Sequence, residues 1–218
     1  MNHNSIPHAP AHAPPPVDFF LLVLQYAPAL CTDGTYKCPT GLPAGTYFTL
    51  HGLWPERADG SYPATCTNDK FNPSAVQPIM SELNTYWPSL NGPSNTFWAH
   101  EYEKHGTCAQ DVLPTEFDFF NTTLSIRNAY DVTPALAKAG ISPSASATFT
   151  KAAFQNAVTT AFGYPVLVEC DSAGAITGAT VCIDKNTFKA RSCGSVTYGV
   201  CNSQTLKLLP LTGSHLRG

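Results

Sequence analysis

The stretch that decides the fold is VDFFLLVLQY, residues 17–26. It is almost entirely apolar and rich in aromatic and branched side chains, a pattern typical of a buried strand. The apolar run extends only to residue 30 and is interrupted by Gln25, Tyr26 and Pro28, so it is too short to span a bilayer. We therefore expect residues 17–26 to form a central strand, and we expect no membrane association.

The segments around this strand predict an α+β fold. Residues 46–55, TYFTLHGLWP, begin with β-branched and aromatic residues and stop at Pro55, which predicts a strand with His51 and Trp54 at its end. Further short strands are predicted from VLVEC, ATVCID and SVTYGVC, at 166–170, 179–184 and 195–201. Because the strands flank the helical segments rather than alternate with them, we expect a mainly antiparallel central sheet flanked by helices.

Four segments between the strands have helical spacing. In residues 73–88 the apolar side chains recur on one helical face, with Ser74 in the N-cap position. Three more helices are predicted, at 114–130, 133–139 and 148–162. Gly140 and Gly163 follow the last two of these, where a C-cap glycine is expected.

One domain accounts for most of the chain. A length of 218 residues with 43% hydrophobic residues suffices for one sizeable core, and no break in composition divides it. Residues 1–16 are rich in proline, alanine and histidine and lack the apolar core of a signal peptide, so we expect a disordered tail at a mature or engineered N-terminus. We expect the domain to span residues 17–208 and residues 209–218 to form a loose C-terminal tail.

The charge of the chain argues against general attraction to nucleic acid. Charged residues make up only 12% of the sequence, against roughly 25% in an average soluble protein, and the formal net charge is −3. Any binding of a polyanion therefore has to come from a local site.

The cysteines indicate an oxidising compartment. The chain has eight of them, an even number, and none forms a CxxC pair of the kind found in zinc ribbons. We therefore predict four disulfides, although spacing alone leaves more than a hundred pairings open. The sequon Asn121-Thr122-Thr123 is a candidate glycosylation site and fits a secreted protein.

The segment FWAHEYEKHGTC, residues 97–108, concentrates the chemistry. On a helix His100 and Lys104 are neighbours at i, i+4, and so are Glu101 and His105, which places all four on one broad face. A solvated helix with an acid–base ladder would also have such pairs. That alternative does not explain the aromatic residues just before the four, or the glycine and cysteine just after them.

The histidine spacing disfavours zinc. A helical HExxH site needs histidines at i and i+4, whereas His105 is five residues after His100, roughly 140° around the helix. Two histidines from separate segments, such as His51 and His105, can instead act as a proton acceptor and a proton donor. With a cation beside them to hold a phosphate, such a group suits phosphodiester cleavage without a metal or cofactor, with the 2′-hydroxyl of RNA as the nucleophile.

Two segments of the sequence resemble those of a known family. FTLHGLWP, residues 48–55, and FWAHEYEKHGTC resemble the two active-site segments of the ribonuclease T2 family, in order and separation, and the likeness extends over roughly residues 18–201. The resemblance implies that His51 is the general acid toward the leaving 5′-oxygen and that His105 is the base that deprotonates the 2′-hydroxyl. It also implies that His100 binds phosphate, and that Glu101 and Lys104 stabilise the transition state.

The resemblance also implies sites for the bases. Trp54, Glu56, Tyr62 and Phe97 match the upstream base site, and Gln25 matches the downstream one. Core packing is an alternative for Trp54 and Phe97, and the polar end of a buried strand is one for Gln25. Finally, the resemblance implies the disulfides Cys31–Cys38, Cys66–Cys108, Cys170–Cys201 and Cys182–Cys193.

The sequence therefore predicts a secreted or vacuolar endoribonuclease that is metal-independent, monomeric and active on single-stranded RNA at acidic pH. The products would be a 2′,3′-cyclic phosphate and then a 3′-phosphate. The alternatives are a catalytically silent binding or signalling protein of the same fold, a zinc hydrolase and a disulfide-rich storage protein. The presence of all three interior histidines disfavours the first of these, and their clustering disfavours the last.

Overall fold

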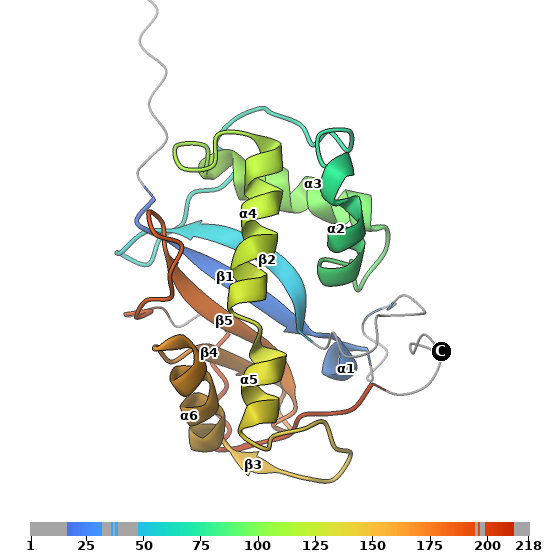
Figure 1. The fold of residues 1–218 in the computed structure, drawn as a ribbon, viewed down its shortest axis with the longest axis vertical. Helices are drawn as coiled ribbons and strands as arrows, with labels where there is room; N and C mark the ends of the chain where they lie inside the picture. Colours follow the sequence, from blue (N-terminus) through green and yellow to red (C-terminus); the bar gives the residue numbers. More distant parts are fainter. Residues whose placement is uncertain are drawn as a thin grey trace, which may run out of the picture.

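The computed structural model describes residues 17–31, 36, 38, 48–194, 196 and 199–211. Its centre is a four-stranded antiparallel sheet, crossed on one face by helices (Figure 1). The strands, in spatial order, are β2 (Phe48–Glu56), β1 (Phe19–Tyr26), β5 (Ile176–Asp184) and β4 (Leu167–Cys170). The predicted α+β class is confirmed, and β1 is the central, fully buried strand that VDFFLLVLQY predicts.

The remaining elements lie around this sheet. The helices are α1 (Ala27–Leu30), η1 (Gln77–Ile79), α2 (Met80–Tyr86), α3 (Ser94–Lys104), η2 (Gly106–Cys108), α4 (Glu116–Ala129), α5 (Val132–Lys138) and α6 (Lys151–Phe162). A second, two-stranded sheet consists of β3 (Phe149–Thr150) and β6 (Thr205–Leu206). In Figure 1, α4 and α5 follow one another across the sheet, and α2 and α3 lie beyond α4 at the β2 side.

Both faces of β1 are buried, which explains why its sequence does not alternate. Phe20, Leu22 and Leu24 join the large core beneath the helices. Phe19 and Leu21 point to the other face and form a smaller cluster with Val23 and Cys182, against which Trp54 packs. Burial on both faces removes the polar side chains that a half-exposed strand would carry.

Three predicted elements differ from the structure. The helix predicted at 73–88 begins only at Met80, after a 3-10 turn, because Pro78 has no N–H to donate inside a helix. In the segment 148–162, Phe149 and Thr150 form β3, and Thr150 caps α6 by accepting from the N–H of Ala153. Of the segment 195–201, the described residues 196 and 199–201 are not in a strand.

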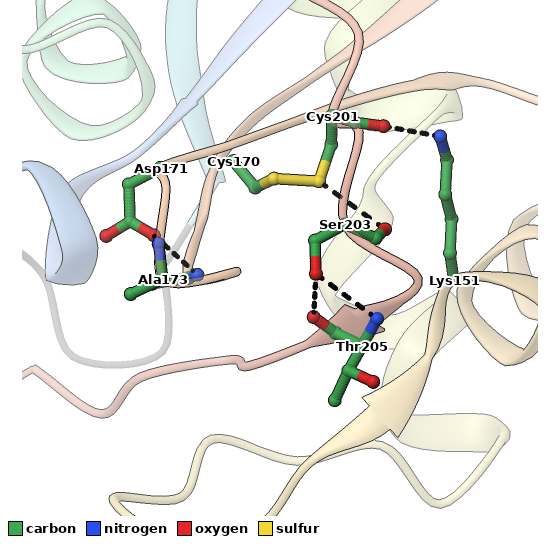
Figure 2. Close-up of a disulfide and its surroundings, with 8 residues drawn as sticks. Lys151, Cys170, Asp171, Ala173, Cys201, Ser203 and Thr205 are labelled. Carbon is green, nitrogen blue, oxygen red and sulfur yellow. Dashed lines mark hydrogen bonds between the residues drawn. A yellow bond between two sulfur atoms is a disulfide. The ribbon is translucent and has the colours of Figure 1, made fainter.

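Near its end the chain is bound to β4 and α6. Figure 2 shows the Cys170–Cys201 disulfide, the ammonium of Lys151 donating to the carbonyl of Cys201, and the hydroxyl of Ser203 donating to the carbonyl of Thr205. The loop after β4 is closed by Asp171, whose carboxylate accepts from the N–H of Ala173. These contacts stabilise a segment with almost no regular secondary structure.

The eight cysteines form the four pairs that the resemblance implies. These are Cys31–Cys38, Cys66–Cys108, Cys170–Cys201 and Cys182–Cys193. Asn121, the sequon residue, is exposed on α4, whereas the hydroxyl of Thr123 is buried and donates to the carbonyl of Phe119. Glycosylation of Asn121 stays a prediction.

The two predicted tails lie mostly outside the described residues, which exclude 1–16 and 212–218. The described part of the C-terminal segment contacts the domain: the hydroxyl of Tyr26 donates to the carbonyl of Leu209 at 2.6 Å, and Leu211 packs against a cluster that includes Leu90. In the part of the chain that the structure describes, no helix has the length and apolar character needed to cross a membrane.

Candidate active site

A β-bulge presents His51. In the β1–β2 ladder Val23 pairs with Gly52 and Leu24 pairs with Leu50, so His51 is the extra residue of β2, without a partner on β1. Bulges of this kind are frequent beside active sites, where they redirect a side chain. The imidazole of His51 is partly exposed, at 38%, and its Nε2 lies 3.7 Å from Oε1 of Glu101 on α3.

Gly52 lets Glu101 approach the strand. A Cβ atom at position 52 would lie 2.1 Å from Oε2 of Glu101 and 2.6 Å from Nε1 of Trp54. Both distances are far below van der Waals contact, so no other residue fits without displacing these two side chains. Gly52 is not among the residues predicted from the sequence, although a glycine inside a strand pattern is a known signal of close approach.

The indole of Trp54 packs against both histidines. Its ring centroid is 5.1 Å from that of His51, edge-on, and 4.9 Å from that of His105, stacked at 13°. Its Nε1 donates to Oε2 of Glu101 at 2.8 Å. His105 is only 3% exposed, and neither of its ring nitrogens has a hydrogen-bond partner among the described residues. One aromatic ring thus contacts both imidazoles and the carboxyl group.

Burial shifts the proton affinities of these groups strongly. Burial, together with the positive charges of His100 and Lys104, lowers the pKa of His51 to about 4 and that of His105 to about 3. Burial also raises the pKa of Glu101 to about 8, against the opposing effects of the Trp54 hydrogen bond and Lys104. Perturbed groups that share one site are typical of acid–base chemistry.

Two hollows adjoin this cluster. One, of about 340 Å³, is lined by His51, His100, Gln25 and Phe97, among others. The other, of about 290 Å³, is lined by Trp54, Glu56, Tyr62, Lys104 and His105. The residues with predicted roles are therefore brought together, in two groups with Glu101 buried between them.

Phe97 differs from its predicted place. The resemblance groups it with Trp54, Glu56 and Tyr62, but it lines the hollow that contains Gln25, and its ring packs edge-on against His51 at 5.4 Å. Phe97 lies on α3 one turn before Glu101, which directs its ring to the His51 side.

The polar residues of the two hollows are held in different ways. The amide nitrogen of Gln25 donates to the carbonyls of Leu50 and Pro88, which fixes the side chain at the end of the hollow. Glu56 is almost fully buried, and burial raises its pKa to about 7, so its carboxyl group can carry a proton in mildly acidic solution. Tyr62 is 58% exposed at the rim.

The helix that carries the second motif ends just before His105. α3 ends at Lys104, and His105 is its C-cap residue, with its N–H bonded to the carbonyl of Glu101. The chain then turns at Gly106, where a Cβ atom would lie 2.5 Å from the ring of Tyr102. The Cys66–Cys108 disulfide ties this turn to the loop after β2.

Several solved ribonucleases have the same fold. The S-like ribonuclease trichomaglin aligns with a TM-score of 0.80 and 34% identity, covering 91% of this chain and all of trichomaglin. RNase NT in complex with 5′-AMP aligns with a TM-score of 0.78 and 26% identity, covering 90% of this chain and all of that one. The fold and the histidine cluster together define a protein of the ribonuclease class.

Sequence comparison gives the family. The model of the ribonuclease T2 family matches residues 17–193. Ribonuclease DdI of Dictyostelium discoideum is 39% identical, covering 85% of this chain and 82% of that protein. Extracellular ribonuclease LE of Solanum lycopersicum is 33% identical, covering 85% and 84% of the two chains. The chain belongs to the ribonuclease T2 family and is an endoribonuclease of the T2 type.

Proposed function

We propose that this protein cleaves single-stranded RNA without a metal ion, by attack of the 2′-hydroxyl on the adjacent phosphate. The observation that carries the proposal is that His51, from β2, and His105, from the end of α3, both pack against one indole ring, that of Trp54. Lys104 and His100 provide positive charge beside them. No nucleophilic side chain is required, because RNA supplies its own.

In the first step His105 accepts the proton of the 2′-hydroxyl, and the 2′-oxygen forms a bond to phosphorus. The bond from phosphorus to the 5′-oxygen breaks, and protonated His51 donates its proton to that oxygen. The products are a 2′,3′-cyclic phosphate and a free 5′-hydroxyl. In the second step the roles reverse: His51 takes a proton from water, and His105 returns one to the 2′-oxygen, leaving a 3′-phosphate.

The surrounding groups would stabilise the charge that develops on the phosphoryl oxygens. Lys104 and His100 would interact with these oxygens electrostatically. Glu101, whose pKa burial raises to about 8, would be protonated at acidic pH and able to donate a hydrogen bond to the same oxygens. Because neither ring nitrogen of His105 is exposed, the Trp54 indole would shift when RNA binds.

The two hollows would hold the bases on either side of the cleaved bond. Trp54 and Tyr62 offer aromatic faces for the upstream base beside the carboxyl of Glu56. Gln25 and Phe97 would contact the downstream base. Unpaired bases can enter such hollows and stacked duplex bases cannot, which favours single-stranded RNA.

Secretion is the location that fits this activity. Four disulfides persist in an oxidising compartment, and one relative is named an extracellular ribonuclease. We expect the protein to act as a monomer in the secretory pathway, outside the cell or in a vacuole.

The decisive experiment is digestion of a defined RNA oligomer in EDTA, with the end groups identified by mass spectrometry. We expect 2′,3′-cyclic phosphate ends that convert slowly to 3′-phosphates. His105→Ala should abolish cleavage and leave the circular dichroism spectrum unchanged. Activity that disappears in EDTA and returns with zinc would contradict the proposal, as would 5′-phosphate ends.

A further inference from the structure

The main-chain carbonyl of His51 has a partner outside the sheet. His51 is the bulged residue of β2, without a partner in the register of β1, and β2 is an edge strand of its sheet. The carbonyl oxygen of His51 accepts a hydrogen bond from Nε1 of Trp87 at 2.8 Å. Trp87 follows directly after α2, thirty-six residues away in sequence.

The indole of Trp87 is itself held firmly. It is fully buried and packs against Phe120 with a centroid distance of 5.1 Å. The N–H of Trp87 bonds to the carbonyl of Leu83, and its own carbonyl accepts from Nε1 of Trp98 at 2.8 Å. The donor that reaches His51 is thus attached to a fully buried, aromatic part of the core.

The imidazole of His51 has weaker anchors. It packs edge-on against Trp54 and Phe97, and its Nε2 lies 3.7 Å from the Glu101 carboxyl, which is beyond hydrogen-bond distance. The direction of its Cα–Cβ bond therefore depends on the backbone of the bulge. The segment just after α2, which contains Trp87, also contacts Gln25: the carbonyl of Pro88 accepts a hydrogen bond from the amide nitrogen of Gln25 at 3.3 Å.

We propose that Trp87 is a positioning residue for catalysis: its indole N–H fixes the bulged peptide of His51 and thereby aims the imidazole at the leaving oxygen. This inference rests on the proposed function, because a fixed imidazole speeds the reaction only if His51 transfers a proton during cleavage. The Trp87 side chain does not line either hollow, so it acts only through His51.

The test is Trp87→Phe, which keeps a buried aromatic ring and removes the donor. We expect kcat for a defined RNA oligomer to fall by about 10- to 100-fold while KM stays within about twofold, because misplacing a catalytic group costs rate rather than binding. In the free protein, the NMR titration of the His51 imidazole should move from about 4 toward the ordinary value of 6.5, because a looser bulge admits water.

Trp98→Phe is the matched control. It removes the same kind of bond, from a buried indole to a main-chain carbonyl, but the acceptor is Trp87 rather than His51. Both variants should have a lower Tm, and both are to be assayed well below it, at equal folded fraction. We expect Trp98→Phe to keep kcat within about threefold of the unmodified protein and to leave the His51 titration in place.

If Trp87→Phe does not fold, β-(3-benzothienyl)alanine at position 87 preserves the ring shape and replaces the N–H with sulfur. Equal losses of kcat in the two variants, or an unchanged kcat in Trp87→Phe, would overturn the inference. Absence of cleavage by the unmodified protein would overturn the proposed function instead. In that case the His51 titration still decides whether Trp87 fixes the bulge.

Discussion

Position 52 has no room for a side chain, because Glu101 and Trp54 occupy the space beside it. A Cβ atom there would lie 2.1 Å from Oε2 of Glu101, so Gly52→Ala should push the carboxyl away from its Trp54 donor. We expect RNA cleavage to fall by about 10- to 100-fold with a small change in Tm. On a Glu101→Ala background only the clash with Trp54 remains, so adding Gly52→Ala should lower the rate by less than it does in the unmodified protein. A full additional loss there would contradict this explanation.

The pH dependence of cleavage follows from the two imidazoles. The pKa of His105 is about 3 and that of His51 about 4, so His105 is neutral over most of the pH range while His51 is charged only in acid. If His51 is the acid, kcat/KM should fall steadily as the pH rises from about 5 toward neutrality. Bound phosphate favours the charged imidazole, so the profile of kcat should extend to higher pH. A rate that still rises above about pH 8 would exclude the two-histidine mechanism.

At the scale of elements, the Cys66–Cys108 disulfide joins the end of α3 to the loop after β2. Replacing both cysteines with alanine should lower kcat as well as stability, because the turn that carries His105 is then held by fewer contacts. The Cys170–Cys201 pair is the control, since its loop of 31 residues is close in length to the 42 of the first. Chain entropy predicts a similar stability loss of about 4 kcal/mol for each.

Activity at low temperature separates the two disulfide variants. Loss of Cys170–Cys201 should leave turnover nearly unchanged when the protein is fully folded, because that bridge lies beside β4 and the chain end. The same outcome for the Cys66–Cys108 variant would show that this bridge only stabilises the fold. Steady-state kinetics at about 15 °C together with thermal melting provides both measurements.

The elements that local patterns govern could be predicted from the sequence. The apolar run at 17–26 became β1, and the pattern at 114–130 became α4, with a capping box formed by Thr115 and Asp118. The helix at 73–88 was wrong at its start because the pattern was followed through Pro78. The two-stranded sheet of β3 and β6 joins segments more than fifty residues apart, and no local pattern predicts that pairing.

The candidate active site, like the fold, could be predicted from the sequence only where local patterns govern it. The residue types at 51, 100, 101, 104 and 105 could be chosen from two short motifs. The bulge at His51 and the stacking of Trp54 on His105 could not, because both arise from contacts between β2 and distant elements. That Phe97 lines the hollow of Gln25 rather than that of Trp54 could not be predicted either. The sequence gives the position of Phe97 along α3, but not how α3 is oriented relative to β2.

At the scale of the whole molecule, buried ionisable groups make stability depend on pH in two opposing ways. Burial raises the pKa values of Glu56 and Glu169 to about 7 and that of Glu101 to about 8, above their ordinary 4.5. The folded state therefore holds protons that the unfolded state has released, and stability falls as the pH rises from 4.5 through these values. The two buried histidines act in the opposite sense, since stability rises with pH from about 4 to 6.5 as the unfolded chain loses its protons.

The two effects largely offset each other between pH 4.5 and 6.5, whereas only the carboxyl groups act above 6.5 and only the histidines act below 4.5. We therefore expect Tm to be highest in mildly acidic solution and to fall between about pH 6.5 and about pH 8, as calorimetry at constant ionic strength would show. Glu169 tests the cause, because it lies away from the histidines and its Oε1 accepts from the hydroxyl of Thr180, a bond that glutamine can also form. Glu169→Gln should make the decline shallower on the alkaline side and leave the acid side unchanged. A Tm that rises from pH 6.5 to 8, or a decline that this substitution does not alter, would show that buried carboxyl groups do not set the stability of the fold.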